Sequence, residues 1–474
     1  MTPKNDSFDR FGDDLAELLF KYMPIEDKLR LQSVSKQWLQ LLFIGQTYLI
    51  FGDSFYKTFN FTERRRNEIF MIFESIFKKC PKIDRLVVGR QSVYNQYIRL
   101  DEIFDQFFDL LIIYCPRLRH IIIEYIPPRG SFLAEVTDKT IERFVAAYGQ
   151  QLLTFKFITD CSTQLMFSDK FLPHLHQFKC LKYYGSQLTI NELFDYQQQD
   201  VFRGIVVLPT SLQSICIELT ANCLPMFASF AINYGHQLKA LDIIRCDLRD
   251  ETPVEQTFVT TLLKFCQLRR LRIHVRFDHF NQLIDELLRQ HFSRRCHQLR
   301  RLYLTGDSYN NINRESINQL IDILGKDLKQ LKRLAIHCFA ENELSNYKTI
   351  LNSDSLKNMK QLTHLSLHFL SKFCGDEIFR DIDSRLPRLE FIDINNPIIT
   401  RESMQSMSRL RHLNCVRLAG CHNPDIDDNY SMDDLISALS MVTNVYISFS
   451  KNTKYVIKVI YQRIAYISVK TINY

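Results

Sequence analysis

The sequence predicts an α/β protein in which a short helical segment is followed by a solenoid of strand–helix units with parallel strands. Three observations lead to this prediction. A dense amphipathic pattern occupies residues 11 to 45, and a Leu-x-x-Leu-x-Leu pattern recurs from about residue 80 onward. The length of 474 residues also exceeds what one compact core usually holds, which favours several domains or a repeat array.

The N-terminal segment has the pattern of three short helices. Apolar residues recur at the i, i+3, i+4 and i+7 spacing of one helix face: Leu15, Leu18, Leu19 and Tyr22. Pro24 ends this helix, Ile25 to Leu31 begin the next, and Ser35 can cap a third. A chain below roughly 40 residues buries too little surface to hold a fold by itself, so the surplus apolar face needs a partner.

The order of residues in this segment resembles the F-box, the adaptor-binding motif of substrate receptors in SCF-type (Skp–cullin–F-box) ubiquitin ligases. The resemblance lies in acidic-Leu-x-x-Leu-Leu, an aromatic residue, Met-Pro, Glu-Asp, Leu-x-Leu and Val34-Ser35-Lys36-x-Trp38. It implies docking on a Skp-family adaptor, and through it on a cullin scaffold, by these residues: Leu15, Leu18, Leu19, Tyr22, Met23, Pro24, Leu29, Val34 and Trp38. Phe11-Gly12 stand where the family usually has Leu-Pro, which is a departure at the first contact. The plain alternative is an amphipathic helix hairpin packed on the following domain.

From Cys80 onward the Leu-x-x-Leu-x-Leu pattern, with aliphatic or aromatic substitutes, recurs thirteen times. It runs from Ile83/Leu86/Val88 to Val442/Val445/Ile447 and includes Phe178/Leu181/Tyr183. The first residues are mostly about 24 to 35 apart, near the range of leucine-rich repeats. Each pattern predicts a strand, and helical stretches are expected between strands, among them Asp101 to Tyr114, Thr137 to Gly149, Asn313 to Leu324, Thr400 to Met407 and Ser431 to Leu439.

One strand–helix unit cannot bury both of its apolar faces, so the units should stack into a horseshoe with strands on the concave face and helices outside. A cysteine before the strand, as at Cys80, Cys115, Cys266 and Cys296, resembles the cysteine-bearing leucine-rich repeats that commonly follow an F-box. The expected domains are a disordered N-terminus (1–10), the F-box (11–50), a helical linker (51–79) and a leucine-rich-repeat domain (80–474). Insertions are expected near residues 160–175 and 187–208.

The composition excludes several classes of protein. Hydrophobic residues at 46%, with only 13 Gly and 13 Pro, exclude a disordered or collagen-like chain. Residues 1 to 14 are polar and no run approaches roughly 18 apolar residues, so we expect an intracellular soluble protein of the cytoplasm, the nucleus or both. Arg64-Arg65-Arg66 is either a nuclear signal or a solvated helix face. A net charge of +7 is modest at this length, and neither a nucleic acid nor a membrane is an expected partner.

Motifs of catalysis and cofactor binding are missing from the sequence. It has no phosphate-binding glycine loop, nucleophile elbow or His-Glu-x-x-His motif, and no cofactor is expected. The 13 cysteines include no Cys-x-x-Cys, which argues against a zinc module, and the spacing of His291, Cys296 and His297 fits ordinary packing better than a metal site. Together with the family resemblance, this implies a non-catalytic chain whose partners supply the chemistry.

Strand alternation places a basic stripe on the concave face. The residue before each of the two inward positions, and the one after the last, should point away from the core. In consecutive units these candidate substrate-binding residues are Arg270, Arg272, His274, Arg301, Tyr303, Arg333, His337, His364 and His368. The stripe fits either an acidic or phosphorylated target segment or a merely solvated surface. Its histidines are expected to strengthen binding as the pH falls through about 6.5.

The function that follows is substrate recognition in an SCF-type E3 ubiquitin ligase, with the F-box holding the adaptor and the repeats presenting a target. Such a receptor acts by raising the effective concentration of a target lysine near the charged enzyme. The alternative is a leucine-rich-repeat scaffold or inhibitor outside any ligase. The identity of the target is not readable from the sequence.

Overall fold

A computed structural model gives the structure of the chain. It describes residues 15, 18–20, 23–34, 41–43, 45–59, 66–89, 104–125, 137–159, 172–189, 208–220, 224–247, 254–275, 279–308, 314–340, 356–369, 376–395, 397, 399–421, 442, 444–451, 454–461 and 464–466. The chain divides into two compact units, Met1–Cys216 (unit 1) and Ile217–Tyr474 (unit 2). The strand β6 (Ser214–Thr220) crosses this division.

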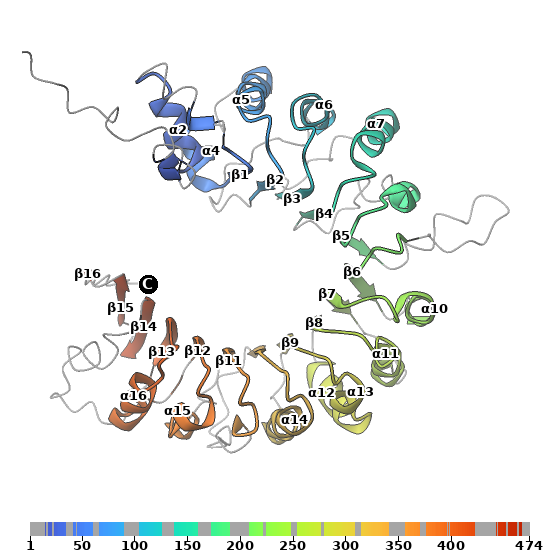
Figure 1. Cartoon of the computed structure of the whole chain (residues 1–474). Coiled ribbons are helices and arrows are strands. Elements are labelled where there is room, and N and C mark those ends of the chain that lie inside the picture. Colours follow the sequence, from blue (N-terminus) through green and yellow to red (C-terminus); the bar gives the residue numbers. More distant parts are fainter. Residues whose placement is uncertain are drawn as a thin grey trace, which may run out of the picture. The chain divides into compact units, whose positions relative to one another are not determined.

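Unit 1 begins with the short helix α2 (Ile25–Leu31) and continues as strand–helix repeats (Figure 1). Its parallel strands pair in chain order: β1 (Tyr48–Phe51), β2 (Arg85–Val88), β3 (His120–Tyr125), β4 (Thr154–Thr159) and β5 (Tyr183–Thr189). The helical segments are α4 (Asp53–Thr58), α5 (Arg66–Lys79), α6 (Phe104–Tyr114), α7 (Asp138–Tyr148) and the 3₁₀ turn η3 (Leu172–Gln177). The sheet starts one strand earlier than the repeat pattern predicts, because β1 already pairs with β2.

Unit 2 repeats the same arrangement. Its parallel strands are β7 (Ala240–Asp247), β8 (Arg270–Val275), β9 (Arg301–Ser308), β10 (Arg333–Ala340), β11 (His364–Phe369), β12 (Phe391–Asn395), β13 (Cys415–Cys421) and β14 (Asn444–Lys451). The antiparallel strands β15 (Lys454–Tyr461) and β16 (Ile464–Tyr466) follow. Its helices are α10 (Leu224–Tyr234), α11 (Val254–Leu262), α12 (His279–Arg289), α13 (Phe292–Arg295), α14 (Arg314–Asp327), α15 (Ile382–Arg385) and α16 (Arg401–Ser408), with the 3₁₀ turn η6 (Asp376–Ile378).

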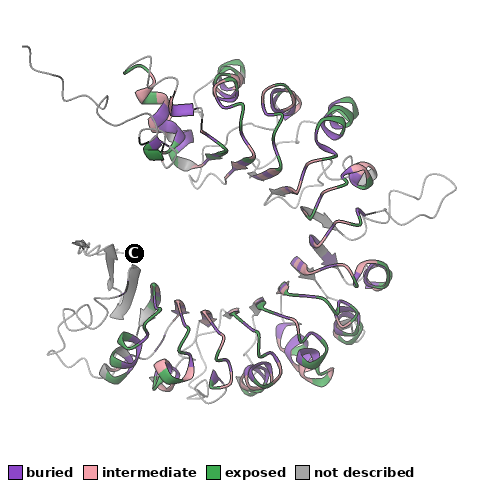
Figure 2. Ribbon diagram, viewed as in Figure 1, coloured by how far each residue is buried: buried purple, intermediate pink, exposed green. Residues whose placement is uncertain are grey.

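The Leu-x-x-Leu-x-Leu positions form the core between strands and helices. The strand β8 alternates between buried and more exposed residues, and Leu268, Leu271 and Ile273 are fully buried. Figure 2 shows the same division across the repeats, with helices buried toward the strands and exposed on their outer side. The predicted fold class, an α/β leucine-rich-repeat solenoid, is therefore confirmed.

In one repeat the predicted motif Phe178/Leu181/Tyr183 is out of register with the observed strand, because Leu181 and Tyr184 occupy its first two positions. The strand pairing sets Tyr183 opposite Thr154 and Tyr184 opposite Phe155, and Tyr184 rather than Tyr183 is buried. Phe178 is instead buried at the helix-to-strand turn, three residues before Leu181. A large apolar residue at that turn imitates the first leucine of the motif, which explains the wrong assignment of Tyr183.

A similar shift affects one of the four cysteines expected before a strand. Cys80, Cys115 and Cys296 are fully buried, whereas Cys266 is exposed. Phe265 takes the buried position in that repeat, because it stands three residues before the first motif leucine, as the other cysteines do. Cys266 precedes its strand as expected, but it does not hold the buried position that Cys80, Cys115 and Cys296 hold.

Backbone hydrogen bonds lock each helix-to-strand turn to the turn of the preceding repeat. In unit 2 the amide of Arg300 donates to the carbonyl of Arg269 at 2.8 Å, and the amide of Lys332 donates to the carbonyl of Arg300 at 2.8 Å. The same bonds join Arg119 to Asp84 in unit 1. Residues at the same position in successive repeats therefore form a row across the strands.

Helix boundaries follow the capping signals of the sequence. The Thr137 hydroxyl accepts a hydrogen bond from the amide of Thr140 at the start of α7, and Thr400 forms a capping box with Ser403 at the start of α16. The predicted helix Ser431 to Leu439 lies outside the described residues. In the described residues, no helix is long and apolar enough to cross a membrane.

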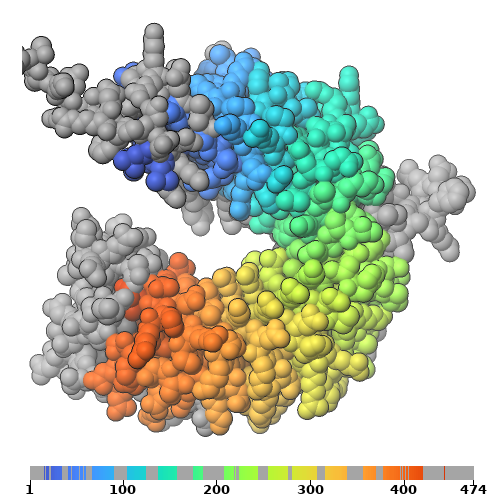
Figure 3. Space-filling view, viewed as in Figure 1, coloured from blue at the N-terminus to red at the C-terminus, as the bar shows by residue number. Residues whose placement is uncertain are grey.

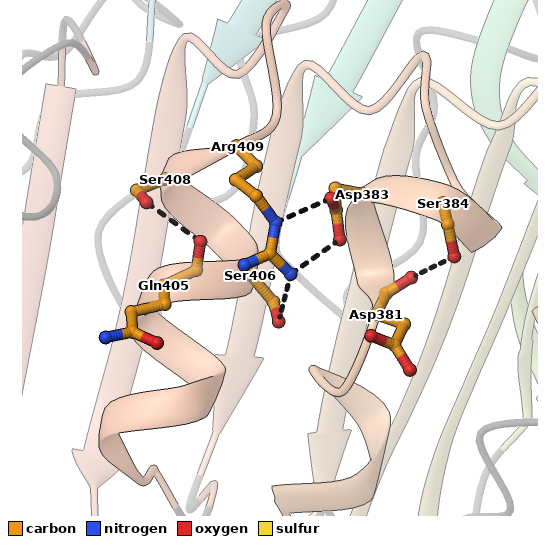
Figure 4. Close-up of polar contacts among 7 residues, drawn as sticks. All are labelled: Asp381, Asp383, Ser384, Gln405, Ser406, Ser408 and Arg409. Carbon is orange, nitrogen blue, oxygen red and sulfur yellow. Dashed lines mark hydrogen bonds and ion pairs between the residues drawn. The ribbon is translucent and has the colours of Figure 1, made fainter.

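Side-chain contacts also tie neighbouring repeats on the helical side. The Arg409 guanidinium, just after α16, holds Asp383 on α15 with bonds of 2.8 and 3.3 Å and also reaches the Ser406 hydroxyl at 3.1 Å (Figure 4). This contact lowers the pKa of the Asp383 carboxyl. Consecutive repeats of unit 2 lie against one another in chain order in the space-filling view (Figure 3).

Candidate functional site

Among its described residues, the N-terminal segment exposes four large apolar side chains. Leu15, Leu18 and Leu19 are helical and are 41%, 52% and 48% exposed, and Val34, just after α2, is 59% exposed. Apolar side chains of this size usually lie inside a protein, and contiguous exposed ones mark contact sites. Of the other predicted adaptor contacts, Met23 and Leu29 are half-buried and Pro24 is exposed, while Tyr22 and Trp38 lie outside the described residues.

A different set of residues forms the core beneath this surface. Phe20, Ile25, Leu42 and Phe43 are buried against the start of unit 1. Pro24 precedes α2, in agreement with the predicted break between the first two helices. The segment thus has one buried apolar face and one exposed apolar face, which is the arrangement that an amphipathic pattern with surplus leucines predicts.

One buried lysine lies inside the same segment, and no sequence pattern singles it out. Lys28 on α2 is 1% exposed, and its ammonium donates to the side-chain oxygen of Gln46, whose amide in turn donates to the carbonyl of Tyr48 on β1. Burial lowers the pKa of the Lys28 ammonium to about 8. This chain of bonds connects α2 to the first strand of the sheet.

A second contact joins α2 to the first repeat helix. The Lys79 ammonium at the end of α5 donates to the Gln32 side chain at 2.5 Å and lies 5.7 Å from the Phe43 ring centroid. A cleft of about 650 Å³ opens between α2, α4 and α5, with Leu29 and Met71 among its lining residues. The position of α2 is therefore set by polar contacts to β1 and α5.

The second candidate surface is the face of the unit 2 strands that carries no helices, called the helix-free face below. The register of the strand pairs places the side chains of this face in rows that run across the strands. One row runs Arg270, Arg301, Arg333, His364 and Phe391, and the next runs Arg272, Tyr303, Ala335, Ser366 and Asp393. The third runs His274, Thr305, His337 and His368. The predicted stripe residues thus share one face, with Ala335 buried between its neighbours.

Two stripe residues are already engaged by carboxylates on neighbouring strands. The Arg270 guanidinium lies 2.9 Å from Asp242 on β7, and His368 Nε2 lies 2.9 Å from Asp393 Oδ1 on β12. Both acids occupy strand positions that alternation would place on this face. Their pairing could not be anticipated because about 25 residues separate the partners in the chain.

The stripe histidines do not act as the sequence suggested. His337 stacks on His368 with 4.1 Å between ring centroids, and its Nε2 lies 2.8 Å from the Ser366 hydroxyl. Burial, with the neighbouring His368, lowers the pKa of His337 to about 4, and burial followed by Arg333 lowers the pKa of His364. The expectation that these two histidines gain charge near pH 6.5 is wrong, because burial and nearby cations oppose protonation.

Three cations of the stripe remain available. Among the described residues, no carboxylate lies within ion-pair distance of Arg272, Arg301 or Arg333. Arg301 on β9 and Arg333 on β10 lie side by side in register, and Arg272 lies beside Tyr303 in the next row. A compact basic patch of three arginines around one tyrosine therefore replaces the continuous basic and imidazole stripe.

The candidate metal residues do not come together. Cys296 is buried, while His291 and His297 are exposed. In the part of the chain that the structure describes, no group of three or more His, Cys, Asp or Glu residues could hold a metal ion. Burial raises the pKa of the Cys296 thiol to about 12, which suits a packed apolar residue.

Comparisons with known proteins identify the N-terminal segment. The family model of the F-box domain matches residues 8–43. This range contains the exposed leucines and α2. No curated protein sequence matches the chain significantly.

Solved structures similar to the chain are leucine-rich-repeat proteins or domains, at low similarity. An internalin, InlF, from Listeria monocytogenes is 13% identical over 70% of this chain and 81% of that one, with a TM-score of 0.33. The leucine-rich repeat-containing protein LegL7 from Legionella pneumophila is 10% identical over 84% and 91%, with a TM-score of 0.28. The ectodomain of the Arabidopsis receptor kinase HAESA is 15% identical over 66% and 44%, with a TM-score of 0.28.

TM-scores this low do not establish a shared fold. The evidence for the repeat fold is the strand–helix units, the buried motif positions and the hydrogen-bonded turns described above. The F-box match and these repeats occupy consecutive parts of one chain. The chain is an F-box protein with leucine-rich repeats.

Proposed function

We propose that this chain is the substrate-recognition subunit of an SCF-type E3 ubiquitin ligase. Its F-box binds a Skp-family adaptor and, through the adaptor, a cullin scaffold, and its repeats bind the target protein. The observation that carries the proposal is the exposure of four large apolar side chains inside the matched F-box, those of Leu15, Leu18, Leu19 and Val34. The chain performs no chemistry in this proposal, because proximity of target and charged enzyme is sufficient.

The adaptor contact is tested by a pull-down of a purified Skp-family adaptor with the full chain. Leu19→Asp puts a carboxylate into the desolvated contact, which costs several kcal/mol when the charge has no pair, so binding should fall at least about 100-fold. Ile113→Asp on α6 is the matched control, because Ile113 is also an exposed apolar residue on a helix but lies outside the F-box. Full adaptor binding by Leu19→Asp, with the repeats still folded by circular dichroism, refutes the assignment and favours a scaffold or inhibitor outside any ligase.

For the target, we propose the helix-free face of β8 to β10, where Arg272, Arg301 and Arg333 have no described carboxylate partner. Arginine binds carboxylate or phosphate through two parallel hydrogen bonds, so an acidic or phosphorylated target segment fits this patch. The test reverses charge at Arg272 and Arg301 together and compares captured proteins by affinity purification and mass spectrometry. An unchanged set of captured proteins, with adaptor binding intact, removes this face from target recognition.

A further inference from the structure

A second basic surface lies at the N-terminal edge of the unit 2 strands, outside the helix-free face. The residue that ends each helix-to-strand turn is a lysine or arginine in four consecutive repeats: Lys239, Arg269, Arg300 and Lys332, here called the rim row. The amide of Arg269 donates to the carbonyl of Lys239 at 2.7 Å, and the two following turns are joined in the same way at 2.8 Å. The rim row therefore advances at the strand spacing of about 4.8 Å.

Among the described positions of this row in unit 2, positive charge is confined to these four repeats. The following positions of the same row are Thr363, Glu390 and Asn414, which follow one another through the same backbone bonds. Arg269, Arg300 and Lys332 are exposed and Lys239 is half-buried. No carboxylate within the described residues pairs with any of the four.

Unit 1 shows that side chains at successive positions of this row reach one another. There the row contains Asp84 followed by Arg119, and the Arg119 guanidinium lies 3.7 Å from the Asp84 carboxylate. The same backbone bonds set the like charges of the rim row on neighbouring turns. Like charges on neighbouring strands repel each other, and a bound polyanion would reduce that repulsion.

We propose that the rim row binds an acidic segment of a partner protein. Arg300 and Lys332 end the turns before β9 and β10, and Arg301 and Arg333 are the first residues of those strands. Neighbouring side chains along an extended chain point in different directions, so the cations occupy two adjoining faces. A flat membrane can meet only one of these faces, whereas a flexible acidic chain can contact both. Single-stranded nucleic acid usually needs aromatic platforms, and the rim row has none. The proposal does not depend on adaptor binding.

The test uses the full chain and a fluorescein-labelled peptide of ten glutamates, measured by fluorescence anisotropy at low salt. The variant Arg269→Glu/Arg300→Glu/Lys332→Glu should lose about tenfold or more in affinity, and the corresponding triple glutamine variant should lose less. Lys182→Glu is the matched control, because Lys182 is exposed at the same row position in unit 1 and should leave binding unchanged. Circular dichroism confirms that each variant is folded.

Three outcomes would overturn the proposal. The first is equal peptide affinity of the wild type and both triple variants. The second is loss of peptide binding only in Arg272→Glu/Arg301→Glu, which would assign the peptide to the helix-free face. The third is tighter, rim-dependent binding of vesicles containing phosphatidylserine or of an oligothymidine, which would make a lipid surface or a nucleic acid the occupant.

Discussion

Replacing the buried Lys28 by methionine tests how the F-box is attached to the repeats. Burial lowers the pKa of the Lys28 ammonium from 10.5 to about 8. Below pH 8 both the folded and the unfolded chain carry this proton, so the folded state bears the full cost of a desolvated charge. Between pH 8 and 10.5 only the unfolded chain keeps it, so the free energy of unfolding rises with pH by about 3 kcal/mol.

The substitution Lys28→Met removes that cost but leaves the buried side-chain oxygen of Gln46 without its donor, which costs about 1–3 kcal/mol. The two effects nearly cancel at pH 7, so the expected net change is between about 0 and 2 kcal/mol in favour of the variant. The decisive quantity is therefore the pH dependence. We expect the rise between pH 8 and 10.5 to be present in the wild type and absent in Lys28→Met.

The assay is urea denaturation of the full chain at pH 7, 8, 9 and 10, followed by circular dichroism. Lys82→Met is the control, because Lys82 is an exposed lysine in the turn between α5 and β2. Other groups titrate in the same range, and they do so equally in all three proteins. Identical pH slopes for wild type and Lys28→Met would refute the view that this ammonium is desolvated.

Three more predictions concern unit 2. Because the pKa of His337 is lowered to about 4, the wild type should lose stability as the pH falls from 6.5 to 4, and thermal melting of His337→Asn should show a smaller loss. Arg409→Ala should cost up to about 1 kcal/mol at pH 7 in urea denaturation. This cost should vanish as the pH falls through the lowered pKa of Asp383, and a cost that persists in acid would contradict the ion-pair account. Gly235→Ala should destabilise the chain by about 1–3 kcal/mol, since a Cβ there would lie 2.8 Å from the carbonyl oxygen of Lys264, whereas Ala substitution at the open Gly52 should not.

The repeat fold was predictable because it depends on residues close together in the chain. Leu268, Leu271 and Ile273 lie within six positions, and their spacing alone decides which side of the strand is buried. The errors arose where one more apolar residue adjoined the motif. The pattern alone places Phe178 at the first motif position, and it does not distinguish Cys266 from the neighbouring Phe265, because only three-dimensional register separates these alternatives.

The candidate sites were less predictable, because their properties depend on residues from different repeats. The sequence places Arg270, His337 and His368 on one face, but it does not tell which of them meets a carboxylate. It also gave no sign that His337 would stack on another imidazole and resist protonation. Strand alternation does not predict the rim row, because its residues lie outside the strand positions that alternation assigns to the helix-free face.

The pairing of Arg270 with Asp242 changes how a target would be bound. If Arg270 joined Arg272, Arg301 and Arg333, each of the four guanidinium groups could form a charge-assisted hydrogen bond with the target worth about 1.5–3 kcal/mol. Arg270 must first leave Asp242, which is only 14% exposed, and a nearly buried carboxylate loses its ion pair with Arg270 at a cost of similar size. The gain and the cost then cancel, so Arg270 adds little to affinity. Recognition on the helix-free face should therefore depend on Arg272, Arg301 and Arg333, and Asp242 should hold Arg270 in place beside them.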